Sequence, residues 1–226
     1  MKKLLFIFSI LSYTCVNAQE DLGWVTPSTN VDSLRKAFMS RKPLPPVRRF
    51  TKYDSFVKPN FDADSIRYEF VKLYLQHCKK IGKETIYSQE MDTAVQFHLR
   101  YIVKNYHFDD TKPMEGKNSL HYEEPLDMRH PWDRISKLCP SLSYLKDGKV
   151  AEVCTGLEIS GFVNRYYMDN NLKTNKDIAL ELYNNLINSA PHKQIMEDKS
   201  FKYYNYGIII DGDRYYVVGD FFEKKY

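Results

Sequence analysis

The sequence predicts an α+β domain, because helical patterns dominate the front of the chain and strand patterns lie in its middle and at its end. Apolar residues recur at threes and fours over residues 65–81 and 88–106, which is the spacing of helices with one buried face. Residues 203–210 and 214–222 are rich in β-branched and aromatic residues, and Asp211-Gly212-Asp213 separates them. The chain should therefore close with an antiparallel hairpin. This order of elements suits a layered α+β domain better than a parallel α/β sheet.

Local signals mark where the helices begin and end. Gly82 follows the first helix as a stop, and Pro131 occupies the first-turn position of a short helix. Thr174 and Asp177 form a capping-box pattern at the start of a third strong helix. His98 lies within the apolar stripe of the second helix, so we expect it to be a core histidine.

The first 60 residues are expected to lie outside the domain. Lys2 and Lys3 precede an apolar run that is too short to span a bilayer, and Val16-Asn17-Ala18 offers the small residues that a signal peptidase reads. We therefore expect residues 1–18 to be a signal peptide; an uncleaved anchor is the less favoured alternative. Residues 19–60 are rich in proline and predict an extension or linker, and residues 61–226 form the domain.

Composition and charge narrow the classes of partner. The formal net charge is +4 and falls by two without Lys2 and Lys3, and no basic cluster is present, so nucleic acid is not expected. No second long apolar run occurs, so no membrane span is expected in the mature chain. Export predicts a secreted or periplasmic protein. The 18 Tyr suit an extracellular binding surface, although strands alone would also explain them.

Three cysteines remain after the expected cleavage: Cys78, Cys139 and Cys154. Export permits a disulfide, and an odd count leaves at least one thiol free or intermolecular. Cys139 and Cys154 lie 15 residues apart, and closing that loop would stabilise the fold by about 3 kcal/mol. We therefore expect these two to pair, and Cys78, on a helix face, to be a buried thiol.

The sequence contains no G-x-S-x-G, H-E-x-x-H or G-x-G-x-x-G motif and no phosphate-binding glycine loop. What remains is a loose set: His121 in a loop, Glu152 in a strand expected at residues 149–155, and His192 at a helix start. Ser189 is the expected N-cap of that helix, whose dipole favours a neutral His192. Two histidines and a carboxylate could hold a divalent metal, or act as general base and electrostatic partner.

Five segments together carry a family resemblance. Ser189-Ala190-Pro191-His192 resembles a Ser-Pro-Gly-His helix start, and Ala151-Glu152-Val153 resembles a Gly-Glu-Asn strand. Pro131-Trp132-Asp133-Arg134-Ile135 is similar to a Pro-Trp-Asp-Arg-Ile segment, and His121 falls where a His follows the second helix. Val217-Val218-Gly219-Asp220-Phe221 fits a closing strand. In their order and spacing along the chain, these segments resemble the CAP superfamily (cysteine-rich secretory proteins, antigen 5 and plant pathogenesis-related proteins), and especially its bacterial extracellular, SCP-like members.

The resemblance implies an α-β-α sandwich, with a small antiparallel sheet flanked by helices, and a cleft lined by two His and one or two Glu. It also implies that zinc can lie between the two His, as in some members. Carried over to this chain, the cleft residues are His121, Glu152 and His192, and Ser189 stands near the place of a second Glu. Leu186 replaces the Trp of many members.

Two hypotheses of different class follow. The first is a secreted CAP-type binding or interaction module without catalysis, whose cleft takes a divalent metal such as Zn²⁺ or a small apolar ligand, or which contacts another extracellular protein. The second is a metal-assisted, protease-like hydrolase that uses the same residues. The incomplete set of carboxylates and the lack of an identifiable nucleophile favour the first hypothesis.

Overall fold

The structure is a computed structural model, and it describes residue 53 and residues 55–106, 119–121, 128–145, 149–159 and 163–223. The chain divides into two units, Met1–Arg49 and Phe50–Tyr226, and only the second contains described residues. The expected signal peptide and most of the expected extension therefore lie outside the described residues. The described elements are α2 (Ala63–Ile81), β1 (Ile86–Tyr87), η1 (Gln89–Met91), α3 (Asp92–Asn105), α4 (Pro131–Leu138), η4 (Pro140–Leu142), β2 (Val150–Glu158), α5 (Val163–Asp169), α6 (Asn175–Ile187), α7 (Ala190–Glu197), β3 (Tyr203–Asp211) and β4 (Arg214–Phe222).

One four-stranded sheet, in the order β1-β3-β4-β2, forms the middle of the domain. The β3–β4 hairpin and the β4–β2 pair are antiparallel, as the sequence predicts. The two-residue strand β1 runs parallel to β3, so the sheet is mixed and not purely antiparallel. Strand β2 lies at the other edge of the sheet, and this position matters for the candidate site.

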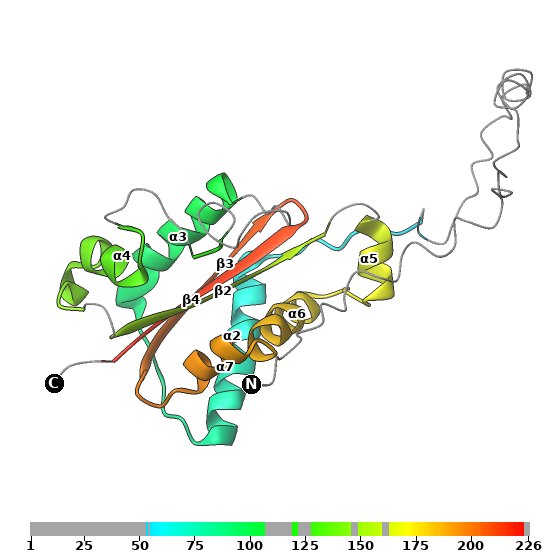
Figure 1. Ribbon diagram of the computed structural model, residues 1–226. Helices are drawn as coiled ribbons and strands as arrows, with labels where there is room; N and C mark the ends of the chain where they lie inside the picture. Colours follow the sequence, from blue (N-terminus) through cyan, green and yellow to red (C-terminus); the bar gives the residue numbers. More distant parts are fainter. Residues whose placement is uncertain are drawn as a thin grey trace, which may run out of the picture. The chain divides into compact units, whose positions relative to one another are not determined.

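Helices cover both faces of the sheet (Figure 1). Successive residues of β2 point to opposite faces of the sheet. Val153 joins the core formed with α2 and α6, whereas Cys154 packs with residues of α3. Val150 and α4 residues share a third apolar cluster on the α3 side. The predicted α+β class and the arrangement of helices around a small sheet are therefore confirmed.

The predicted helix ends agree with the structure. Gly82 closes α2 in the left-handed conformation, with φ of 65°. Thr174 caps α6, and its hydroxyl accepts the backbone N–H of Asp177 at 3.3 Å. Gly212 has φ of 62° in the two-residue turn between β3 and β4, which a residue with a Cβ adopts poorly. The second helix starts later than expected, because η1 occupies residues 89–91 before α3 begins.

The expected disulfide between Cys139 and Cys154 is not present. Both side chains are free, buried thiols in different apolar clusters: Cys139 packs with Met91 and Ile135, and Cys154 packs with Val95 and other α3 residues. Spacing along the chain suggested a closed loop, but the two side chains contribute to separate parts of the core. Cys78 is also a free, buried thiol, as expected.

The end of the expected extension packs on the domain. Phe56 and Phe61 stack on Tyr167, with ring centroids 6.0 and 5.7 Å away. Lys58 donates from Nζ to the carboxylate of Asp213 at 2.5 Å, in the hairpin turn. The folded unit therefore includes residues before position 61. Among the described residues, no helix is both long and apolar enough to cross a lipid bilayer.

Candidate functional site

Glu152 lies at the centre of the site, on the edge strand β2. Its side chain shares the α3 face of the sheet with that of Cys154, because residues two apart on a strand point the same way. The neighbouring residue across the ladder is Asp220 on β4, which is fully buried, and Glu152 itself is 7 % exposed. A carboxylate at this depth needs partners, because burial without them disfavours the charged form.

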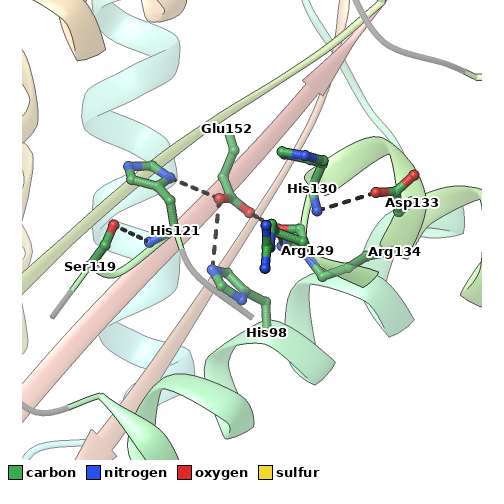
Figure 2. A network of polar contacts seen from close by, with 8 residues as sticks. All are labelled: His98, Ser119, His121, Arg129, His130, Asp133, Arg134 and Glu152. Carbon is green, nitrogen blue, oxygen red and sulfur yellow. Dashed lines mark hydrogen bonds and ion pairs between the residues drawn. The ribbon is translucent and has the colours of Figure 1, made fainter. Parts of the chain in front are cut away.

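Arg134 supplies the compensating charge. Helix α4 begins at Pro131, and the backbone N–H of His130 donates to the carboxylate of Asp133 at 3.4 Å, which fixes the first turn. Arg134 follows with 0 % exposure. Its guanidinium donates to Glu152 Oε2 and to the backbone oxygen of Arg129, so the charge is held in place from two sides (Figure 2).

Two histidines complete the surroundings of the carboxylate (Figure 2). His98, fully buried on α3, places Nε2 at 3.7 Å from Glu152 Oε1, and His121 places Nδ1 at 2.9 Å from the same oxygen. Burial alone would raise the pKa of Glu152, but Arg134, His98 and His121 together hold that pKa well below its usual range. Glu152 is therefore an ionised carboxylate that only accepts hydrogen bonds.

This contact sets the tautomer of His121. Because the Glu152 carboxylate accepts, Nδ1 of His121 carries the hydrogen, and Nε2 of a neutral ring keeps its lone pair. The His121 side chain is 45 % exposed, so solvent reaches the ring. A histidine whose one nitrogen is fixed by a carboxylate has its other nitrogen available as a ligand or proton acceptor.

His192 lies next to His121, from the opposite layer of the sandwich. Its helix α7 packs on the α2 side of the sheet, and the two ring centroids are 5.9 Å apart. Burial, and then the neighbouring His121 ring, lower the pKa of His192, so the ring is held neutral. Nδ1 of His192 is buried and has no hydrogen-bond partner within the described residues. The structure thus places the His121 ring beside the neutral imidazole of His192.

Ser189 occupies the N-cap position of α7, as expected, and Pro191 follows in its first turn. The Ser189 hydroxyl makes no capping hydrogen bond, so the expectation that it accepts an orphan N–H is wrong. The backbone oxygen of Ser189 instead accepts from Lys193 at 2.8 Å, as in any first turn. Position in the first turn, and not side-chain capping, places His192.

A second group of side chains has ligand atoms close enough together to hold a metal ion. His98, Glu152 and Cys154 each offer one ligand atom, and these atoms lie within 4.8 Å of one another. Charge argues against this group, because Arg134 already binds Glu152 and would lie beside the ion. Burial and the Glu152 charge also raise the pKa of the Cys154 thiol well above its usual value, whereas a metal binds the thiolate. The His121–His192 pair has neither obstacle.

The sequence predicts His121, Glu152 and His192 as neighbours, and the structure brings them together. Two further residues belong to the arrangement. His98 is the expected core histidine, but it also lies beside the carboxylate. Arg134 stands within the Pro-Trp-Asp-Arg-Ile segment but was not predicted to be a site residue. The signal in the sequence that could have identified it is a charged residue next to the apolar positions of a very short helix.

No protein-family model matches this chain, and no curated protein matches its sequence. A solved structure of an outer surface protein from Borrelia burgdorferi is similar, with 13 % identity and a TM-score of 0.46 over 72 % of this chain and 94 % of that one. An extracellular protein containing an SCP domain, from Bacillus anthracis strain Ames, has 12 % identity and a TM-score of 0.45 over 72 % of this chain and 41 % of that one.

Proposed function

We propose that this chain is a secreted or periplasmic SCP-type binding module, and that His121 and His192 form a binding site for a divalent metal ion such as Zn²⁺. One observation carries the proposal. The two rings lie 5.9 Å apart, one with Nδ1 fixed by Glu152 and the other with a buried nitrogen that has no hydrogen-bond partner within the described residues.

The donor set fits such an ion. Zinc binds neutral imidazole nitrogens at about 2.0–2.1 Å, so two rings that share an ion must be neighbours, as these are. Nε2 of His121 and a ring nitrogen of His192 would hold the ion. Glu152 would support His121 through the outer hydrogen bond, a common arrangement for metal-binding histidines. A bound ion would supply a Lewis acid with open positions, which can take an anionic or carbonyl-containing ligand.

Binding is favoured over the hydrolase alternative. Cys154, the thiol that shares the Glu152 face, is buried and has a raised pKa, so it does not suit a nucleophile. Two imidazoles make an open and weak site, whose occupancy should fall as pH falls and the rings take up protons. Such a module would present a metal-bound ligand or contact another extracellular protein without catalysing a reaction.

Titration calorimetry with ZnCl₂ at neutral pH tests the proposal. Wild-type protein should give a saturable heat with one ion per chain, and a double variant, His121→Ala with His192→Ala, should give none. His77→Ala is a matched control, because His77 lies on α2 and also bonds a carboxylate, that of Glu197 on α7 at 2.9 Å, but does not belong to the His121–His192 pair. Equal heats from the wild type and the double variant would refute the site.

Export is the second part of the proposal, with cleavage after Ala18 and residues 19–60 as an extension whose end packs on the domain. The motivation is the short apolar run followed by Val16-Asn17-Ala18. The intact mass of protein recovered from outside the producing cells decides between processing and an uncleaved anchor. A mass that still includes residues 1–18 would contradict this assignment.

A further inference from the structure

Helix α2 has an outward face that is unusually apolar for a helix of an exposed layer. Its buried stripe, which includes Phe70 and Tyr74, packs into the core. On the opposite side, Tyr68 is 67 % exposed and Leu75 is 41 % exposed. Together with Val71 they line a groove of about 340 Å³ on the surface. We define the outward face of α2 by Asp64, Tyr68, Val71, Lys72, Leu75 and Lys79.

Charges are distributed unevenly along this face. Asp64 lies in the first turn of α2 and Lys79 in its last turn, with the apolar residues between them. The Asp64 side chain is 90 % exposed, and its carboxylate lies 3.9 Å from the guanidinium of Arg67. Arg67 also pairs with Asp92, so it only partly compensates the charge of Asp64. The face is therefore negative at one end and positive at the other.

The pattern is self-complementary. If two α2 helices pack antiparallel about a twofold axis between Val71 and Lys72, then Tyr68 meets the partner's Leu75. The same register places Asp64 opposite the partner's Lys79. Lys72 lies near the axis, but it pairs with Glu69 of its own helix at 3.5 Å, so its charge is met within its own chain.

We propose that the outward face of α2 binds a second copy of this chain, as an antiparallel helix pair in a symmetric dimer. A twofold interface needs one patch that complements itself, and apolar and charged positions match here in a single register. A partner of different sequence would have no reason to require that symmetry. A helix of 19 residues presents a face about 28 Å long, which is small for an interface, so the dimer should be weak, in the micromolar range or above.

Sedimentation velocity over a concentration series tests the proposal, using the protein from about 1 to 500 µM to cover weak association. The wild type should shift from monomer to dimer. Leu75→Glu should remain monomeric throughout. Leu180→Glu is a matched control, because Leu180 is 42 % exposed on α6 and does not line the groove, so this variant should dimerise like the wild type.

Charge reversal tests the antiparallel register itself. Asp64→Lys alone or Lys79→Asp alone should weaken the dimer about tenfold, because each places like charges opposite each other twice. The double variant should recover dimerisation, since the pairs are restored with exchanged signs. Circular dichroism checks that α2 remains folded in each variant. A wild type that is monomeric over the whole series overturns the dimer, and so does a Leu180→Glu effect equal to that of Leu75→Glu. A double variant no better than the singles overturns this register.

Discussion

Replacing Arg134 with Met should destabilise the domain more than almost any other single change at this site. Arg134 is fully buried and donates to Glu152, which is itself 7 % exposed. Met preserves much of the side-chain volume but removes the guanidinium. The Glu152 carboxylate then remains in a low-dielectric environment without the opposite charge that Arg134 supplies.

The expected loss follows from that geometry. Removing one partner of a buried ion pair costs about 3–5 kcal/mol, because the remaining charge stays desolvated. For a domain of this size, each kcal/mol lowers the melting temperature by about 2–4 °C, so Arg134→Met should lower it by about 6–20 °C. Glu152→Leu should cost a similar amount, since it isolates the guanidinium of Arg134.

A double-mutant cycle in thermal and urea unfolding is the assay. Arg134→Met combined with Glu152→Leu removes both charges, and an apolar replacement of a buried pair is often nearly neutral. The double variant should therefore be more stable than either single variant, with a coupling energy of at least about 2 kcal/mol. Losses that add up in the double variant would show that the two side chains do not stabilise each other, and would refute the buried Arg134–Glu152 ion pair.

Three further predictions concern the frame of the domain. Phe56→Ala should destabilise the domain by about 1–3 kcal/mol in urea unfolding, because the Phe56 ring packs on Tyr167. An unchanged unfolding free energy would show that the segment before position 61 is not part of the fold. Gly212→Ala should cost about 1–2 kcal/mol, since φ is 62°, and an unchanged melting temperature would contradict the turn. The pKa of Asp177 lies below its usual value of 3.8, because burial raises it but hydrogen bonds from Thr174 lower it by more. The stability that this carboxylate contributes is therefore present above pH 3.8 and is lost as the pH falls through the pKa of the folded state. Asp177→Asn should flatten that part of the melting profile, and an identical acid profile would refute the cap.

Local patterns predicted the parts of the fold that depend on local physics. The stripes of α2 and α3, the cap at Thr174 and the turn at Gly212 each follow from residues within a few positions of one another. The two-residue strand β1 was not predicted, because its pairing with β3 joins positions far apart in the sequence. The disulfide was mispredicted for the same reason, since spacing along the chain does not show which cluster each thiol enters.

The site shows the same division between local and long-range signals. His192 could be placed at a helix start because Pro191 lies beside it in the chain. The role of Arg134 could not be derived from periodicity, because a guanidinium in a core becomes acceptable only when a carboxylate from another element faces it. His98 illustrates the converse, because a stripe position predicts burial but not which polar atom lies opposite the ring.

The meeting of His121 and His192 depends on the edge position of β2. Glu152, to which His121 bonds, points to the α3 side of the sheet, whereas His192 comes from α7 on the other side. Side chains from opposite layers of a sandwich are normally separated by the sheet between them. Because β2 has no further strand beside it among the described elements, the two rings can approach past its edge to 5.9 Å.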